Sequence, residues 1–466
     1  MIKIQKACEL ESDFFAVRDF GSSLETVKTI LSDVKVKKDF ALHEYAKKFD
    51  AADPAVFEIP QSDLKAAAKK MEKQDPALYE ALSYSRDLAL EFAKKQKESF
   101  GDFEIELRPG LFTGQRTVAV EKVGAYVPAG RFPLLSTVIM TVMPAKAAGV
   151  KETIICTPPR VHPDDLKKAG NVSAETTSSV SSVAEGISGK AFSGGKPYAD
   201  EGIMAAAYIC GTDRVFACGG AQAIAAMAFG TQSVPQVDVI VGPGNKFVAE
   251  AKKLVYGAVG LDMAAGPTEV FIIADSSANP KWIAADLLAQ AEHDVVAQPV
   301  LATPSREFAF SVAAEIEKQL ETLQTKNIAR ESIDNFGRII ITESLEQAAD
   351  IANRKAPEHL ELAIDEDSKL DKIEKLVHNY GSLFIGHSSA EVLGDYAAGI
   401  NHTLPTSGSA RFTGGLSVRC FLKTVTTLRT KPGYDGVNKS AKVSACLGDA
   451  EGLFAHAQAA RLRIRE

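Results

Sequence analysis

Beyond residue 100, short runs rich in β-branched residues alternate with segments of helix length. These runs include VGAYVP, ETIICTPP, DRVFAC, VDVIVGPG, TEVFIIAD, GRIIITES and GSLFIG. Apolar strands separated by helices form parallel sheets that helices cover on both faces. Seven or more such strands favour two α/β sheets over a single one. By contrast, residues 22–100 carry charged sequence of helical period, such as SDLKAAAKKMEK, which predicts an α-helical N-terminal region.

Length, charge and cysteine usage narrow the class of function. A chain of 466 residues can form two or three domains, and 45% hydrophobic with 24% charged residues is typical of a soluble protein. The net charge of −7 would repel nucleic acid and anionic membranes, so we expect a small-molecule substrate and neither of those partners. The first residues contain no signal-peptide core and no apolar run could span a bilayer, which predicts a cytoplasmic protein. The six cysteines form no C-x-x-C pair, so any metal must be held by His, Gln and carboxylates.

Two predicted strands run directly into glycine turns that precede helices. They are DRVFACGGAQAIAAMAFG (213–230) and VDVIVGPGNKFVAEAKKLV (237–255). Free backbone N–H groups and the positive end of the helix dipole suit a phosphate at such a turn. Either turn could hold part of a nucleotide, although tight connections explain them equally well. GPGNKF has Phe247 where the dinucleotide fingerprint needs its third glycine.

The segment LLAQAEHD (287–294) predicts a helix end at which Gln290 and His293 share one face. Residues three apart on a helix are neighbours, so the two side chains can approach one point. His is the commonest zinc ligand, whereas Gln is a neutral and weaker one. A capped helix end exposed to solvent explains the pair as well as half of a metal site does.

Two further segments combine acids with histidine. In KAPEHLELA (355–363), Glu358 and His359 are adjacent, and both can be tuned to accept protons near neutral pH. The alternative is an ordinary helix start with Pro357 in its first turn. In LGDYAAGINHTLPTSG (393–408), Asp395 and His402 lie in a loop of the kind that is often positioned for ligands. A turn-forming Asp and a hydrogen-bonded His explain that segment equally.

Two segments stand apart from the alternating strands and helices. The Ser- and Gly-rich stretch 161–196 predicts a surface excursion rather than a functional lid. The final stretch, EGLFAHAQAARLRIRE, predicts an amphipathic helix that has to dock, possibly on a second subunit. It contains Glu451 and His456, whose spacing alone proves nothing. Its apolar side is formed by Leu453, Phe454, Ala457, Leu462 and Ile464.

Together and in this order, these segments resemble the histidinol dehydrogenases, zinc-dependent enzymes that end histidine biosynthesis. The resemblance runs from about residue 110 to the C-terminus. Each matching stretch is modest evidence, but the ordered set is highly specific. The stretches are VGAYVPAG, STVIMTVMPAKAAGV, GGAQAIAAMAFGT, VDVIVGPGNKFVAEAK, DMAAGPTEVFIIAD, AQAEHD, APEHLEL, GSLFIG, GDYAAGINHTLPT, ARFTGG and AEGLFAHAQA.

The resemblance implies oxidation of L-histidinol through L-histidinaldehyde to L-histidine with two NAD molecules in succession. His359 would take the hydroxyl proton, and Glu358 would help to activate water for attack on the aldehyde. One zinc ion per subunit would orient the substrate, held by Gln290, His293, Asp395 and His456. These four, with His359, also fall at substrate-contacting positions, as do Thr268, His402 and Glu451. The positions that match NAD contacts are Tyr126, Gln222 and Asn245.

The resemblance also implies an α/β fold of two incomplete Rossmann-like domains with parallel-rich sheets, the second inserted within the first. The expected division is an N-terminal segment 1–25, a discontinuous catalytic domain of 26–125 and 270–416, an inserted NAD-binding domain 126–269 that carries the 161–196 insertion, and a C-terminal helical tail 417–466. Members of the family are homodimers in which the tail crosses to complete the partner's site. A monomer would then lack one zinc ligand.

Some residues leave other hypotheses open. Thr268 stands where the family usually has Ser, and Ala129 replaces a common Gly. GRFPLLS and ARFTGGL resemble the sister branch of sulfopropanediol dehydrogenases, in which Arg131 could pair with a sulfonate, whereas GDYAAG, PEHLEL and STVIM favour the histidinol enzymes. A zinc hydrolase would turn over without NAD. An inactive two-lobed binding protein is the remaining class, against which the intact Glu358–His359 pair argues.

Overall fold

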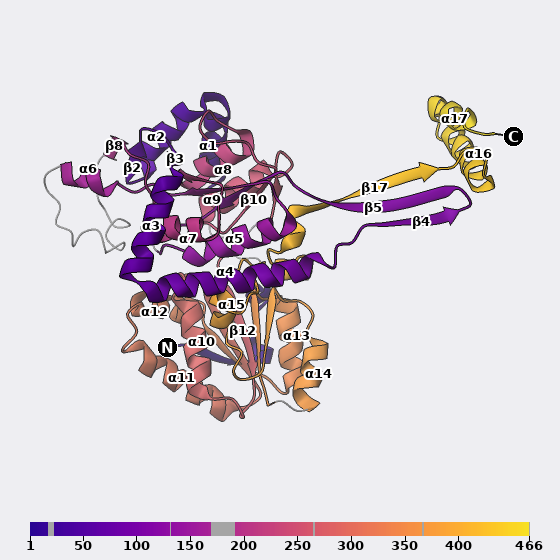
Figure 1. The fold of residues 1–466 in the computed structure, drawn as a ribbon. Helices are drawn as coiled ribbons and strands as arrows, with labels where there is room; N and C mark the ends of the chain where they lie inside the picture. The colour runs from indigo at the N-terminus through magenta and orange to yellow at the C-terminus, as the bar shows by residue number, and fades with distance from the viewer. Residues whose placement is uncertain (17–22, 131, 169–191, 264–265, 366–367, 466) are drawn as a thin grey trace.

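Two α/β lobes and a projecting arm make up the fold of the computed structural model (Figure 1). The structure describes residues 1–16, 23–130, 132–168, 192–263, 266–365 and 368–465. We call the lobe built on strands β12–β16 lobe A and the lobe built on strands β6–β11 lobe B. The C-terminus lies at the tip of the arm, far from both lobes (Figure 1).

Lobe A contains a six-stranded parallel sheet in the order β1-β14-β13-β12-β15-β16. Along β12, Val270 and Ile272 pack toward α10–α12, whereas Phe271 and Ile273 pack toward α13 and α14. Both faces are therefore buried, as the unbroken apolar runs of the sequence predict. The elements are β1 (Lys3–Lys6), β12 (Glu269–Ala274), α10 (Pro280–Ala291), β13 (Gln298–Thr303), α11 (Arg306–Leu320), α12 (Lys326–Asn335), β14 (Arg338–Ile341), α13 (Leu345–Lys355), β15 (His359–Ala363), α14 (Ser368–Leu376), β16 (Ser382–Ile385) and α15 (Glu391–Tyr396).

Lobe B contains a second six-stranded sheet, in the order β11-β10-β6-β7-β9-β3, in which only β3 runs antiparallel to its neighbour. One face is covered by α3, α4, α5 and α7, and the other by α1, α2, α8 and α9. The elements are α1 (Leu24–Lys37), α2 (Asp39–Phe49), β3 (Glu58–Ile59), α3 (Gln61–Gln74), α4 (Pro76–Lys97), β6 (Lys122–Tyr126), α5 (Leu135–Ala148), β7 (Glu152–Thr157), α7 (Glu201–Ile209), β9 (Arg214–Ala217), α8 (Gly220–Phe229), β10 (Val239–Val241), α9 (Lys246–Val255) and β11 (Gly260–Leu261).

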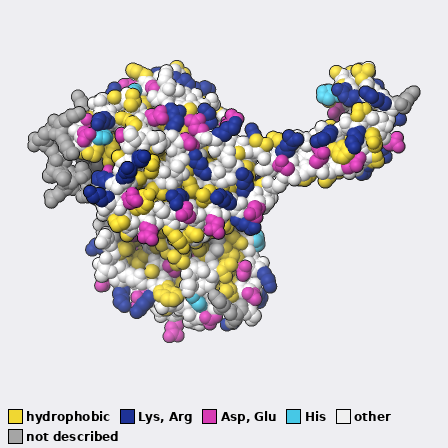
Figure 2. Space-filling model, in the orientation of Figure 1, with side chains coloured by type: hydrophobic (Ala, Val, Ile, Leu, Met, Phe, Trp, Pro, Cys, Tyr) yellow, Lys and Arg dark blue, Asp and Glu magenta, His cyan; other side chains and the backbone are white. Residues whose placement is uncertain are grey.

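The arm is a three-stranded antiparallel sheet that ends in two helices (Figure 1). Strand β17 (Leu422–Thr430) pairs with β5 (Leu111–Ala119), which pairs with β4 (Phe103–Arg108). Helices α16 (Asp435–Ala450) and α17 (Phe454–Arg461) pack on each other at the tip. Large apolar side chains stay exposed on the arm (Figure 2), among them Leu428, Leu447, Phe454 and Leu462.

The two α/β sheets confirm the predicted fold class, but the packing differs from the expected grouping of segments. Strand β1, expected in a separate N-terminal segment, completes the lobe A sheet. The helices of 26–125, expected with 270–416, cover lobe B instead, and β4 and β5 belong to the arm. Periodicity reveals that a helix has an apolar face, but it does not reveal which sheet that face covers.

The structure also bears on two local expectations, the 161–196 stretch and the final helix. In the 161–196 stretch, α6 (Pro163–Lys168) and β8 (Phe192–Gly195) are ordered, and β8 pairs with β2 (Ala52–Pro54). The remainder, 169–191, lies outside the described residues. The single final helix predicted over 451–466 is shorter, because Gly452 takes a positive φ of 74° and separates α16 from α17. Within the described ranges, no helix combines the length and apolar character that a bilayer span requires.

Candidate active site

Glu358 and His359 lie at the amino edge of the lobe A sheet. Helix α13 ends at Lys355, Ala356 takes a left-handed φ of 53°, and β15 begins at His359. The alternative of a helix start at Pro357 is therefore wrong, because the chain goes from a helix through a turn into a strand. The turn is fixed by hydrogen bonds from Gly381 N to Pro357 O and from Ser382 N to Glu358 O, both 3.0 Å.

The Glu358 carboxylate is buried and accepts two hydrogen bonds. The Thr268 hydroxyl donates to Oε2 at 2.5 Å, and the backbone N–H of Glu269 donates to the same oxygen at 3.0 Å. Burial raises the pKa of Glu358 to about 7, although both hydrogen bonds and the nearby His359 oppose this rise. A carboxyl group that titrates near neutrality can both accept and return a proton.

Acids surround the buried imidazole of His359. Its Nδ1 lies 3.8 Å from Glu358 and 3.7 Å from Glu391, and its Nε2 lies 3.7 Å from Asp395. Burial acts to lower the pKa of His359, but these three acids outweigh it and raise the pKa to about 10. Nε2 has no hydrogen-bond partner among the described residues, so it is the ring atom that can meet a substrate.

Three of the four expected zinc ligands lie in the surroundings of this imidazole, where Asp395 is 3.7 Å from Nε2, His293 interacts electrostatically with both groups, and Gln290 contacts Glu391. Gln290 is in the last turn of α10 and His293 follows its end, while Asp395 is in α15. Burial lowers the pKa of His293. Burial alone would raise the pKa of Asp395, but the charge of His359, whose Nε2 lies 3.7 Å away, keeps it below its ordinary value. A neutral imidazole, an ionised carboxylate and an amide oxygen form a donor set that fits a divalent transition metal.

Gln290 and His402 have partners of their own. The Gln290 amide lies 2.5 Å from the Thr268 hydroxyl, and with the amide turned its Nε2 donates to Glu391 at 2.9 Å. His402 contacts the Ser136 hydroxyl through Nε2 at 3.1 Å, and burial lowers its pKa. Thr268, Gln290 and His402 each make a hydrogen bond to a neighbouring side chain, and their role as substrate contacts stays a prediction.

Glu451 and His456 do not join this cluster within one chain. Glu451 caps the end of α16 and His456 lies in α17, both exposed at the tip of the arm (Figure 1). Within the described part of a single chain, no three His, Cys, Asp or Glu side chains come together as a metal site. The fourth expected ligand is therefore absent from the cluster unless another chain supplies it.

The expected cofactor residues line a cavity of about 790 Å³ that reaches from lobe B to His293. Tyr126 ends β6, and its hydroxyl accepts a hydrogen bond from Gly220 N at 3.1 Å. Gln222 lies in the first turn of α8, and Asn245 caps α9 through Phe247 N and Val248 N. The cavity thus lies against the amino ends of two helices, which suits a pyrophosphate.

Sequence reasoning missed several residues of this cavity and site. Glu391 is one, and Asp50, Phe49 and Arg160, which line the cavity, are others. They come from helix ends and loops far apart in the sequence, and no spacing signal marks them. Arg131, which the sulfonate hypothesis singled out, lies outside the described residues.

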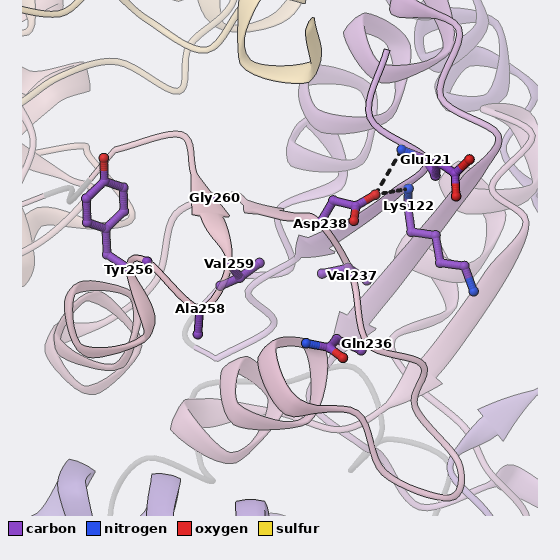
Figure 3. Close-up of a pocket in the computed structure, with 10 residues that line it drawn as sticks. Glu121, Lys122, Gln236, Val237, Asp238, Tyr256, Ala258, Val259 and Gly260 are labelled. Atoms are coloured by element: carbon purple, nitrogen blue, oxygen red, sulfur yellow. Dashed lines mark hydrogen bonds between the residues drawn. The ribbon is translucent and has the colours of Figure 1, made fainter. Parts of the chain in front are cut away.

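A second pocket, of about 590 Å³, lies at the opposite edge of the lobe B sheet (Figure 3). It is formed at the amino ends of β6 and β10, and none of the expected site residues lines it. The Asp238 carboxylate there already accepts hydrogen bonds from Glu121 N and Lys122 N, both 2.9 Å (Figure 3). This pocket is separate from the candidate active site.

The two lobes, the cavity and the acid–imidazole pair define a two-lobed α/β oxidoreductase. Residues 16–185 and 191–464 match the family model described as histidinol dehydrogenase. The histidinol dehydrogenase of Streptococcus mutans is 43% identical over 94% of this chain and 92% of its own, and that of Dechloromonas aromatica is 38% identical over 100% of both. The crystal structure of histidinol dehydrogenase from Elizabethkingia anophelis covers 99% of this chain and 98% of its own at a TM-score of 0.84 and 32% identity. The chain belongs to the histidinol dehydrogenase family.

Membership confirms the predicted family and places the chain among the oxidoreductases of histidine biosynthesis. The relatives just named are histidinol dehydrogenases, so the sulfopropanediol alternative gains no support. The zinc hydrolase and the inactive binding protein gain none either.

Proposed function

We propose that this protein oxidises L-histidinol through L-histidinaldehyde to L-histidine with two NAD molecules and one zinc ion per subunit. The observation that carries the proposal is the buried Glu358–His359 pair, beside Gln290, His293 and Asp395, next to the cavity that Tyr126 and Gln222 line. A proton acceptor, a set of metal donors and a dinucleotide-sized cavity meet at this one place.

When bound, NAD supplies the hydride acceptor and zinc orients the nitrogen atoms of the substrate. In its neutral form, His359 accepts the hydroxyl proton of the alcohol at Nε2, the ring atom that lacks a partner, and the three surrounding acids stabilise the imidazolium that results. Glu358 then takes a proton from the water that attacks the aldehyde carbon, helped by a pKa of about 7. Thr268 holds Glu358 through its hydroxyl, so it positions the carboxyl group for this step.

We further propose that the arm completes the site of a second subunit, with His456 as the fourth zinc ligand and Glu451 as a substrate contact. The support is threefold. The arm projects from the body, it exposes apolar side chains such as Phe454, and both residues lie at its tip (Figure 2). In a C2 dimer whose subunits exchange arms, these side chains would be buried, and each tip would reach the site of the other subunit.

The direct test is an NADH assay of zinc-loaded protein with L-histidinol and, separately, with 2,3-dihydroxypropane-1-sulfonate. We expect two NADH per histidinol and none with the sulfonate. Activity with the sulfonate alone would transfer the assignment to the sister branch. Turnover of a substrate without any NADH would instead favour the hydrolase.

A further inference from the structure

The cavity has two sides of different character. His293 and Asp294 connect it to the catalytic pair in lobe A, whereas Ile30 of α1 and Phe49 of α2 line it from lobe B. The hydride acceptor has to reach the side of His359, because hydride transfer requires direct approach of the reacting atoms. The adenosine half of the cofactor is then left to the side formed by Ile30 and Phe49.

Among the described lining residues, one acid lies on this second side. Asp50 follows the end of α2, and its carboxylate lines the cavity next to Phe49. Its one side-chain hydrogen bond among the described residues comes from Gln222 Nε2 at 3.4 Å, which is long. Burial raises the pKa of Asp50 to about 7, although Gln222 and the charge of Arg160 oppose the rise. A poorly solvated carboxylate with one weak donor requires further donors, and a ligand can bring them.

Among the described residues, the other charged groups that line the cavity do not occupy this role. The Arg160 guanidinium donates to the Ala129 carbonyl and carries a positive charge near Asp50. Asp294 and His293 lie on the catalytic side. Asp50 is thus the acid placed to meet the sugar next to the adenine.

We propose that Asp50 accepts hydrogen bonds from the ribose hydroxyls of the adenosine half and makes the site reject a dinucleotide with a 2′-phosphate. This inference rests on the proposed NAD-dependent function. In dinucleotide-binding folds a carboxylate accepts from the ribose 2′-hydroxyl and excludes the phosphorylated cofactor by charge repulsion. That acid normally follows the glycine turn by about 20 residues. In this chain the acid is Asp50, which follows the end of α2 and precedes both glycine turns in the sequence.

The test compares NAD and NADP for the zinc-loaded full-length protein, for D50N and for D50S. Wild type should strongly prefer NAD in kcat/KM. Both variants should lower the ratio of NAD to NADP by about 10-fold or more, because one charge-assisted hydrogen bond is lost and Arg160 becomes free to attract the phosphate. The KM for histidinol should stay within about twofold, because Asp50 lies away from the substrate.

The matched control is D294N, which removes an acid from the same cavity on the catalytic side. Its NAD-to-NADP ratio should stay as in wild type, whatever its absolute rate. Equal losses for both cofactors in D50N and D50S would assign Asp50 a purely structural role and overturn the proposal. So would a wild type that uses both cofactors equally well.

Binding measured by calorimetry separates this inference from the proposed function. A wild type that binds NAD at least 10-fold more tightly than NADP, with D50N lowering that preference by about 10-fold or more, supports Asp50 even if histidinol is not oxidised. A wild type that binds both dinucleotides alike refutes the role of Asp50 even if histidinol is oxidised.

Discussion

Replacing Lys252 by Met should destabilise lobe B by about 3 kcal/mol and weaken NAD binding. The side chains of Lys252 and Asp262 form an ion pair and are only 3% and 0% exposed. Lys252 also donates to the carbonyl of Gly242 at 2.9 Å, and Asp262 accepts from Gly242 N at 2.8 Å and from Met263 N at 2.6 Å. The pair therefore closes the glycine turn that leads into Asn245.

The size of the destabilisation follows from the buried charge of Asp262, which the substitution leaves unpaired. Removing one partner of a buried pair costs about 3–5 kcal/mol, because the other charge stays buried. Asp262 keeps its two amide donors, which places the cost at the lower end of that range. If lobe B unfolds as a unit, this corresponds to a fall in Tm of roughly 5–10 °C. The KM for NAD should rise more than the KM for histidinol, since this turn belongs to the proposed cofactor site and not to the proposed substrate site.

Lys253 provides the matched control. It is the next residue, is 58% exposed, and pairs with Glu250 at 3.7 Å. K253M should change stability by less than about 0.5 kcal/mol. Differential scanning calorimetry of the two variants in parallel is the assay. Equal melting temperatures for K252M and K253M would refute the reasoning, as would a K252M variant that melts like wild type.

Four further outcomes are expected. H359N should lose about 10²–10⁴-fold in turnover with its zinc content, measured by atomic absorption, unchanged; loss of zinc would make His359 a ligand. Thr268→Val should lower turnover more than Thr268→Ser, because only Ser keeps the hydroxyl that donates to Glu358; equal rates would exclude the positioning role. Mixed H359N and H456N subunits should regain about a quarter of wild-type activity, since half of the dimers would hold one intact site; no recovery would place His456 in its own subunit. Burial raises the pKa of Asp50 to about 7, so the folded state binds the proton more tightly than the unfolded state, and the stability of the protein falls as pH rises from about 4 to about 7. D50N should therefore melt at a higher temperature than wild type at pH 8 but not at pH 4. A higher melting temperature at both pH values would contradict this.

The strands and several site residues could be predicted because their signals are local. Unbroken apolar runs such as TEVFIIAD gave β12 and the parallel sheets, since a strand buried on both faces needs no polar side chain. The pair Gln290 and His293 could be placed at a helix end from their spacing and the sequence after it. The family resemblance, rather than spacing, then singled out Glu358 and His359 among equally plausible helix starts.

The missed features depend on contacts between distant segments. Nothing around Asp50 marks it as a cavity residue, because its position depends on how α2 packs against α8. The partner of β17 could not be identified from sequence either, since β5 lies about 300 residues away and the pairing is set by register. The same holds for Glu391, whose contact with Gln290 joins two helices of lobe A.

The edges that the two sheets present to the site explain why one place can serve both an anionic cofactor and a metal. Lobe B presents the carboxyl ends of β6, β9 and β10, after which the amino ends of α8 and α9 lie at the cavity. Lobe A presents the amino edge of its strands, where β15 begins at His359 and α10 and α13 end. Helix amino ends carry partial positive charge and helix carboxyl ends partial negative charge. The field of lobe B therefore favours the pyrophosphate, whereas that of lobe A favours a metal cation, so each lobe suits the charge of the group proposed to bind there.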